Sequence, residues 1–309
     1  MIIINNFNIL LPKATQLNSH IPVYNEEMLS ILTFNTALQD IQFLGQSIYR
    51  PVDFVQERLL ELARQLTSLS PDIICLQELF HSHLQQQVYN LLKSEYPYAK
   101  GIIKKRFSFR LGNELIVFSK YPLKEDRLYK FKSATIEERI FTQKGFFRVL
   151  LELPTGTIQL INIHMTAGGL NNHPEDSLME KIRSLQIRQL FDSVSNELPT
   201  IIAGDLNAGP DSSKKNYQAV LDAGFIDTFN MTGNTDISWD PNNPLVISGD
   251  ENHLPAQRID HIFMNDRALE LMSPTSASIV LNDHSIPVTN TRIPVSDHYG
   301  LMVHFNSQA

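Results

Sequence analysis

The sequence predicts an α/β fold, because short apolar runs of strand length alternate with amphipathic segments of helix length. The run at residues 201–204 shows this most clearly. It breaks at a glycine and then presents Asp205 and Asn207 before a Gly-Pro turn. The run at 73–76 is apolar enough to be buried on both faces, as interior strands of an α/β sheet are, and it leads to Glu78. Strands that end in polar side chains therefore recur along the chain.

The composition is that of an ordinary globular chain with enough apolar residues for a large core. Of 309 residues, 42% are hydrophobic and 19% are charged. The formal net charge of −7 provides no bulk attraction to nucleic acid, although a local basic groove can lie on an acidic protein. The single cysteine, Cys75, cannot form an internal disulfide and suits a reducing compartment.

We recognise neither a membrane-spanning nor a targeting signal. No apolar stretch approaches the roughly 20 residues of a transmembrane helix. Residues 1–6 lack a basic segment and a continuous apolar segment, so we predict no signal peptide. We therefore expect a cytoplasmic protein, or one exported by a route without an N-terminal signal peptide.

The first third of the chain predicts an N-terminal extension and then a strand–helix–strand unit. Residues 1–30 are mixed in character, and we expect them to pack on a single domain formed by residues 31–309. A strand is expected at 31–35, and three-and-four spacing of apolar residues predicts a helix over 52–69. After the strand at 73–78, we expect a second helix with one apolar side formed by Leu84, Val88, Leu91 and Leu92.

Residues 98–163 predict antiparallel strands instead. Strand-like runs at 115–118, 146–153 and 157–163 are joined by turn sequences. Residues 104–110 form a basic and aromatic cluster, which could contact a nucleic-acid backbone or an anionic membrane surface. Such a cluster is more often a solvated loop.

The second half of the chain returns to alternating strands and helices. We expect strands at 161–164, 200–204 and 258–264, helices over 177–195 and 214–223, and a last strand after residues 295–301. Residues 228–256 form a long polar loop that holds the only tryptophan, Trp239. A loop of this length inside a domain is usually functional or disordered. Trp239 is either an anchor of this loop on the core or a functional side chain.

Eight polar residues lie at or near the ends of apolar strands. They are Asn35, Glu78, His164, Asp205, Asn207, Asp260, Asp297 and His298. For any one of them, a role in a turn or in packing is the simpler interpretation. In α/β sheets, however, sites gather at strand ends, so the set can converge.

The chemistry of this set indicates metal-assisted hydrolysis of a phosphate ester. Carboxylates with a carboxamide suit Mg²⁺ or Mn²⁺ rather than structural zinc. An imidazole beside a carboxylate suits a general base whose tautomer the acid fixes. Carboxamides and imidazole can hold phosphoryl oxygens, and we find no nucleophile motif, so water is the expected attacking group.

The ordered motifs resemble the endonuclease/exonuclease/phosphatase superfamily. They are Thr33-Phe34-Asn35, Leu76-Gln77-Glu78, Ile163-His164, Gly204-Asp205-Leu206-Asn207, Arg258-Ile259-Asp260-His261 and Ser296-Asp297-His298. The resemblance runs from about residue 31 to 305. It implies a four-layered α-β-β-α sandwich of two mixed sheets flanked by helices, with residues 31–309 as one catalytic domain and the site at one end.

The resemblance also implies a role for each matched residue. Glu78 would be the principal Mg²⁺ ligand, with Asn35 close by and Asp297 contributing. His298 would be the general base, oriented by Asp260, and Asp205 would help to activate or place the attacking water. Asn207 and His164 would bind the scissile phosphate at the catalytic centre.

Three features are similar to neutral sphingomyelinases, one branch of this superfamily. They are Lys144-Gly145-Phe146 at a strand start, Ser238-Trp239-Asp240-Pro241 before Asn243-Pro244-Leu245, and Gln257-Arg258-Ile259-Asp260 after that loop. The inositol phosphatase branch carries a bulky aromatic and an arginine where this chain has Ala208-Gly209-Pro210. We find no long apolar hairpin and no C-terminal span of the kind that some sphingomyelinases use to reach lipid.

We therefore expect a Mg²⁺-dependent phosphodiesterase, with Mn²⁺ as a substitute, of the sphingomyelinase-type phospholipase C class. Its partner would be a sphingomyelin-like phospholipid at a membrane surface, and its product phosphocholine. A nuclease or RNA deadenylase acting on nucleic acid is the alternative within the superfamily. A non-catalytic binding module is the alternative of another class. No obligate protein partner is evident from the sequence.

Overall fold

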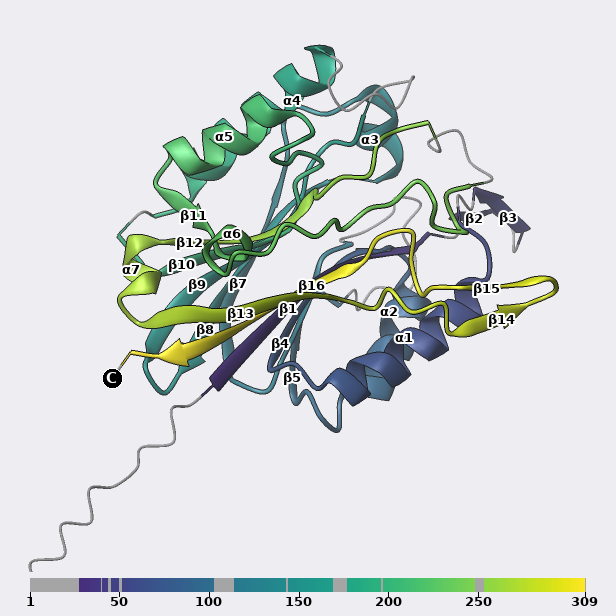
Figure 1. Ribbon diagram of the computed structural model, residues 1–309, viewed down its shortest axis with the longest axis horizontal. Coiled ribbons are helices and arrows are strands. Elements are labelled where there is room, and N and C mark those ends of the chain that lie inside the picture. The colour runs from purple at the N-terminus through teal and green to yellow at the C-terminus, as the bar shows by residue number, and fades with distance from the viewer. Residues whose placement is uncertain are drawn as a thin grey trace, which may run out of the picture.

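Two six-stranded sheets pack face to face, and helices cover the outer face of each sheet (Figure 1). This computed structural model describes residues 28–39, 41–43, 46–49, 52–102, 114–142, 144–168, 177–195, 197–247 and 253–308. The layers confirm the predicted α-β-β-α sandwich. The division into an N-terminal extension and one domain stays a prediction, because residues 1–27 lie outside the described part of the chain.

The first sheet is mixed and holds two motif-bearing strands at its centre. Its order is β13 (Met272–Val280), β16 (Gly300–Ser307), β1 (Met28–Leu38), β4 (Ile73–Leu79), β6 (Ile116–Ser119) and β5 (Tyr98–Lys100). β1 and β4 run parallel, and the other neighbours run antiparallel. The helices α1 (Val55–Leu69) and α2 (Ser82–Leu92) pack on its outer face through Leu59, Leu62 and Val88.

The second sheet has the same mixed character. Its order is β11 (Phe225–Asp227), β12 (Asp260–Asn265), β10 (Thr200–Asp205), β9 (Gly156–His164), β8 (Gly145–Leu153) and β7 (Leu123–Lys130). β9 and β10 run parallel, and the other neighbours run antiparallel. The helices α4 (Ser177–Ser193) and α5 (Lys214–Asp222) pack on its outer face through Ile187, Leu190 and Val220.

Shorter elements lie around these layers. They are α3 (Ile136–Phe141), α6 (Thr228–Met231), α7 (Asp266–Leu269), and the hairpins β2 (Ile41–Phe43) with β3 (Gln46–Tyr49) and β14 (Ile286–Val288) with β15 (Thr291–Ile293). The β14–β15 hairpin projects from the body of the molecule in Figure 1. Its connecting residues, Thr289 and Asn290, are exposed and polar, so it is not a long apolar hairpin.

The central strands are buried on both faces because each contributes to two cores. In β4, Ile73 and Cys75 lie in the core between the sheets, whereas Ile74 and Leu76 lie in the core under α1 and α2. This explains why the run is apolar without alternation. Gly204 permits close contact at the polar end of β10, since a Cβ there would lie 2.0 Å from the carbonyl oxygen of Ile163.

Three predictions differ from the structure. β1 begins at Met28, which pairs with Asn306, so residues 28–30 belong to the sheet rather than to the extension. The antiparallel strands of residues 98–163 are divided between the sheets, because the chain crosses from β6 to β7. Leu91 is 46% exposed, since α2 buries the stripe formed by Leu84, Val88 and Leu92 instead. The basic cluster at 104–110 lies outside the described residues.

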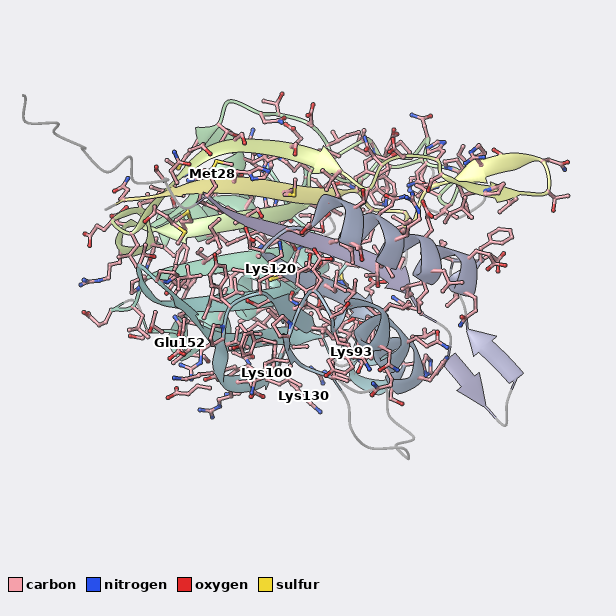
Figure 2. The ribbon with its side chains drawn as sticks, turned by 90° about the horizontal axis from the view of Figure 1, so that it is seen from below. Met28, Lys93, Lys100, Lys120, Lys130 and Glu152 are labelled. Atoms are coloured by element: carbon pink, nitrogen blue, oxygen red, sulfur yellow. The ribbon has the colours of Figure 1, made fainter. Side chains whose placement is uncertain are left out.

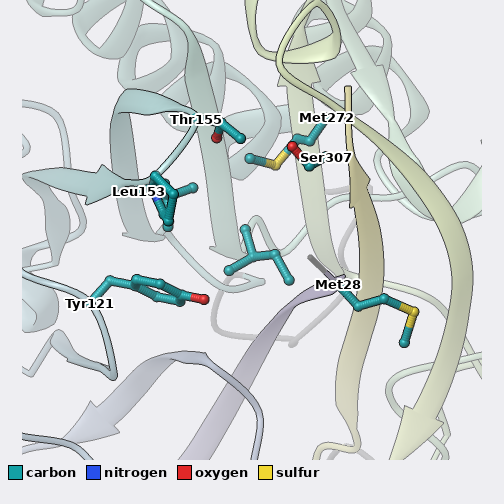
Figure 3. A pocket seen from close by; sticks show the side chains of 8 residues that line it. Met28, Tyr121, Leu153, Thr155, Met272 and Ser307 are labelled. Carbon is teal, nitrogen blue, oxygen red and sulfur yellow. The ribbon is translucent and has the colours of Figure 1, made fainter. Parts of the chain in front are cut away.

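A small cavity of about 20 Å³ lies at one end of the inter-sheet core and is lined by Met28, Tyr121, Leu153 and Met272, among others (Figure 3). Met28 begins β1, whereas the motif residue Asn35 lies near the other end of that strand. The cavity is therefore remote from the polar strand ends, and we assign it no role in the site. Among the described residues, no helix is both long and apolar enough to cross a membrane.

Candidate functional site

The polar strand ends of both sheets meet and bring the predicted residues together. Within the second sheet, Asp205 pairs in register with His164 on one side and with Asp260 on the other. Nδ2 of Asn35, from the first sheet, donates a buried 3.0 Å hydrogen bond to Oδ2 of Asp205. The site is therefore shared between the two sheets.

Asp260 and His298 form a buried pair at the centre of this cluster. Nδ1 of His298 donates to Oδ2 of Asp260 at 2.9 Å, and Nε2 lies 4.0 Å from Oδ2 of Asp205. The bond at Nδ1 selects one tautomer and leaves Nε2 facing Asp205. This arrangement suits a base that takes a proton from water.

Charges in this cluster shift one another's pKa values. Burial disfavours the imidazolium of His298, but Asp260 and Asp205 outweigh it and raise the pKa of His298 well above its usual range. Burial raises the pKa of Asp260, and His298 opposes that rise. Burial also acts against ionised Asp205, but His298 and His164 prevail and lower its pKa. These carboxylates favour the protonated form of His298, and a cation that offsets their charge would favour the neutral form that can act as a base.

A second buried pair holds His164. Oε1 of Glu114 lies 3.0 Å from Nδ1 of His164. Nε2 of His164 lies 3.5 Å from Oε1 of Glu78 and 3.6 Å from Oδ2 of Asp205, and it has no hydrogen-bond partner among the described residues. Burial and Lys144 lower the pKa of His164, but Glu114 and Asp205 prevail and raise it. The imidazolium form suits contact with an anionic group.

Sequence reasoning missed Glu114 and Lys144 as members of this cluster. Glu114 precedes β6, and because β6 is antiparallel to β4, the start of β6 lies beside the end of β4 that carries Glu78. Glu114 directly precedes the apolar run at 115–118, and this place beside a strand is the signal that could have identified it. Lys144 belongs to the Lys144-Gly145-Phe146 motif, which by itself indicates no place in the site. Its buried Nζ donates to the carbonyl oxygen of Met165 at 3.0 Å and lies 3.5 Å from Oε1 of Glu138.

Glu78 and Asn207 both adopt left-handed backbone conformations, with φ of 57° and 50°. Such conformations cost non-glycine residues on the order of 1–3 kcal/mol and are concentrated at functional sites. Nδ2 of Asn207 donates to the carbonyl oxygen of Met165 at 2.9 Å, and its backbone N–H donates to Oδ1 of Asp205 at 2.8 Å. One carboxylate oxygen of Glu78 accepts a hydrogen bond from Gln39, and the other faces His164.

Asp297 is held at the junction between β1 and the segment before β16. The hydroxyl of Ser296 lies 2.8 Å from the carbonyl oxygen of Asn35 and 3.0 Å from Oδ1 of Asp297. Asn35 and Asp297 are thereby tied to one another through Ser296, although they are 262 positions apart in the sequence.

The loop that contains Trp239 is bonded through its backbone and Ser238 to the segments that carry Asp260 and His298. The hydroxyl of Ser238 accepts 3.1 Å hydrogen bonds from the backbone N–H groups of Ile259 and Asp260. The backbone of Trp239 bridges to that of His298, and its side chain is 3% exposed. Trp239 is therefore the anchor of its loop, packed with Val246, Leu254 and Ile259.

The donor set fits a hard divalent cation. Glu78, Asp297 and Asn35 come from neighbouring strand ends of the first sheet, and carboxylate and amide oxygens are ligands that Mg²⁺ accepts. One atom from each of Asp205, Asp260 and His298 forms a second candidate group within 4.8 Å, and Oδ1 of Asp260 has no partner among the described residues. Because Asp260 and His298 bond each other, we keep the first set as the predicted ligands.

Comparison with known proteins identifies the family of this chain. A model of the Endonuclease/Exonuclease/phosphatase family matches residues 32–298. Sphingomyelinase C 1 of Leptospira interrogans is 24% identical over 166 residues, covering 49% of this chain and 28% of that protein. Protein angel of Drosophila melanogaster is 26% identical over 201 residues, covering 59% of this chain and 53% of that protein. The chain thus spans between 27% and 53% of the curated relatives that it matches.

Solved structures share the fold across nearly the whole chain. Sphingomyelinase C from Streptomyces griseocarneus is 19% identical, with a TM-score of 0.71 and coverage of 90% of this chain and 99% of that one. A Staphylococcus aureus beta toxin mutant with bound magnesium ions is 17% identical, with a TM-score of 0.66 and coverage of 91% and 99%. D. rerio TDP2 with a single-strand DNA product is 19% identical, with a TM-score of 0.65 and the same coverage.

Proposed function

The chain belongs to the endonuclease/exonuclease/phosphatase family of metal-dependent phosphoester hydrolases, and we propose that it is a phosphodiesterase of the sphingomyelinase type. It hydrolyses a sphingomyelin-like phospholipid and releases phosphocholine. The observation that carries the hydrolytic assignment is the buried pair of Asp260 and His298 beside Asp205. Relatives named sphingomyelinase support the choice of lipid.

In this proposal, His298 is the base. Asp260 holds Nδ1–H, so Nε2 accepts a proton from a water molecule while the water oxygen bonds to phosphorus. The phosphorus–oxygen bond to the alcohol breaks, the leaving oxygen takes a proton from solvent, and the imidazolium of His298 returns its proton to solvent. Asp205, 4.0 Å from Nε2 of His298, orients the water.

Two other groups bind the phosphate. His164 offers Nε2 as a charged donor, because Glu114 holds the opposite ring nitrogen. Asn207 offers its amide from the strained turn after β10. Mg²⁺ held by Glu78, Asn35 and Asp297 would supply the charge that neutralises the phosphoryl oxygens.

Nucleic acid is a second candidate substrate, because the fold is shared with D. rerio TDP2 in complex with a DNA product. Two of the lysines labelled in Figure 2, Lys100 and Lys120, give a nucleic-acid substrate little support. Lys100 lies 2.7 Å from Asp126, and Lys120 lies 3.3 Å from Asp72. Their charge is therefore partly neutralised within the protein, and the net charge of the chain is −7. For this reason we propose a phospholipid rather than a nucleic acid as the substrate.

The proposal is tested with vesicles that contain sphingomyelin, single-stranded RNA and plasmid DNA, each incubated with the protein and Mg²⁺, with or without EDTA. We expect phosphocholine release that EDTA abolishes and that Mn²⁺ also supports. Cleavage of RNA or DNA with intact sphingomyelin would replace the lipid by the second candidate. If no substrate is cleaved with either metal, the alternative of a non-catalytic binding module is favoured.

A further inference from the structure

A fully buried arginine lies beneath the predicted cation ligands. Arg58, from α1, is 0% exposed, and its guanidinium donates four hydrogen bonds to backbone carbonyl oxygens. Nε donates to Asp53 at 2.9 Å, Nη1 to Thr36 at 3.0 Å and to Val295 at 3.1 Å, and Nη2 to Ala37 at 2.7 Å. The rigid fork of a guanidinium can join several acceptors in this way, which an ammonium cannot reproduce.

These bonds join the two segments that carry Asn35 and Asp297. Thr36 and Ala37 lie in the irregular end of β1, where the register with β4 shifts and Ala37 has a φ of 46°. Val295 lies two residues before Asp297. Arg58 therefore holds an irregular strand end against the segment that leads to the base, and the Ser296 hydroxyl at the Asn35 carbonyl is a second tie at the same junction.

The charge of Arg58 also matters at this position. Burial lowers the pKa of Arg58 to about 10, against the attraction of Asp297 and Glu78. The guanidinium therefore remains charged at neutral pH, and it interacts with two of the predicted cation ligands. A buried cation without such carboxylates nearby would be costly.

We infer that Arg58 is a positioning residue for the cation site, which it preforms by holding Asn35 and Asp297 in place and by offsetting the repulsion between the carboxylates of Glu78 and Asp297. The inference rests on the proposed function, since that proposal supplies the ligand set. In this role Arg58 contacts neither substrate nor metal and acts through the strand ends that it holds.

Arg183 of α4 provides a matched control in the other sheet. It is also 0% exposed, and its Nη1 donates to the carbonyl oxygens of Thr166 at 3.0 Å and Ala167 at 3.2 Å. These residues follow His164, on the side of the site predicted to bind phosphate rather than metal. Replacing Arg183 thus disturbs a buried guanidinium of the same kind without touching the first-sheet junction.

The experiment is calorimetric titration of the metal-free protein with Mg²⁺, together with the Tm of each variant. We expect Arg58→Lys to raise the Kd for Mg²⁺ at least about tenfold and Ser296→Ala to raise it about threefold, as loss of hydrogen bonds at the junction implies. Arg183→Lys should lower Tm but leave the Kd within about twofold, because the sites are separate. At saturating Mg²⁺, Arg58→Lys should recover most of its kcat.

Equal losses of Tm in both arginine variants with an unchanged Kd would show that Arg58 is a structural residue alone, and would overturn the inference. If Arg58→Lys does not fold, Ser296→Ala decides, and an unchanged Kd in that variant overturns the inference as well. Glu78→Gln distinguishes a failure of the inference about Arg58 from a failure of the proposed function. If it binds Mg²⁺ as the wild type does, the proposed ligand set itself is wrong.

Discussion

Oδ2 of Asp260 accepts a 2.9 Å hydrogen bond from Nδ1 of His298, and this contact spans the two sheets. Asp260 begins β12 of the second sheet, whereas His298 lies two residues before β16 of the first. The base and the group that orients it are therefore brought together by packing of sheet on sheet. Any change that shifts the sheets relative to each other should alter proton transfer before it alters the fold.

Replacing Asp260 by Asn should lower kcat by about a hundredfold or more, the usual contribution of a general base. The carboxamide keeps the shape of the side chain but loses the charge, and its amide group can donate to Nδ1 and so place the proton on Nε2. Steady-state kinetics measures the effect. Mg²⁺ binding should stay close to that of the wild type, and an unchanged kcat would contradict the role of Asp260.

Glu78→Gln and His298→Ala should each abolish most activity, by about a hundredfold or more in rate for the base. Glu78→Gln removes the predicted principal ligand, so its defect should include weaker Mg²⁺ binding, whereas His298→Ala should bind Mg²⁺ well. Titration with Mg²⁺ distinguishes the two variants, and their rates are compared with that of the wild type at the optimal metal concentration. If either variant turns over as fast as the wild type, our assignment of the site is wrong.

Glu114→Gln should weaken substrate binding more than it slows turnover. The neutral amide no longer stabilises the imidazolium of His164, which we expect to face the phosphate. A rise in KM of about tenfold corresponds to one charge-assisted hydrogen bond. Glu152→Gln is the control, because Glu152 pairs with the exposed Lys124 on β7. Equal kinetics of the two variants would argue against a role for Glu114.

Gly209→Ala should damage the turn that presents Asn207. A Cβ at Gly209 would lie 1.8 Å from the carbonyl oxygen of Arg258, so the turn must move, at a cost of about 1–3 kcal/mol in free energy of unfolding. We expect kcat/KM to fall with it. Gly224→Ala is the control, since its φ of +87° also causes strain but the added Cβ would have no neighbour within 4 Å. That variant should lose stability and retain kcat/KM.

Asp227→Asn should reduce stability at neutral pH and flatten its dependence on acid pH. Burial disfavours the carboxylate of Asp227, but His261 and Arg258 prevail and lower its pKa, with Nη1 of Arg258 at 2.7 Å. A lowered folded-state pKa contributes stability above the unfolded value of about 3.9. That stability is lost as the pH falls toward the folded-state pKa.

Denaturant titrations from pH 7 to pH 2 measure this loss. We expect Asp227→Asn to cost about 3–5 kcal/mol at pH 7, as removal of one partner from a buried ion pair does, and much less at pH 2. Exposed Asp222 offers the control Asp222→Asn, whose stability should follow the wild type. A constant difference between Asp227→Asn and the wild type across this range would contradict the expectation.

The local pattern of apolar and polar residues accounts for most of the fold and site features that could be predicted from the sequence. The strands that carry Glu78, His164 and Asp205 are apolar on both faces because each contributes to two cores, and that burial is visible in the residues themselves. Their polar ends follow from turn chemistry. Trp239 could not be decided from sequence, because an anchor and a functional aromatic look alike until the apolar neighbours Val246, Leu254 and Ile259 are placed around it.

The pattern of residues along the chain is enough to predict the α/β fold class, the strand ends that carry the site and the residue types available to it, since these depend on local burial and backbone geometry. Which further groups join them depends on tertiary packing. Glu114 enters because β6 runs antiparallel to β4, and Arg58 enters because α1 packs against the end of β1 and the segment before β16, which are distant in sequence. Strand direction and helix docking are set by contacts between remote segments, and no single window of the sequence contains both sides of such a contact.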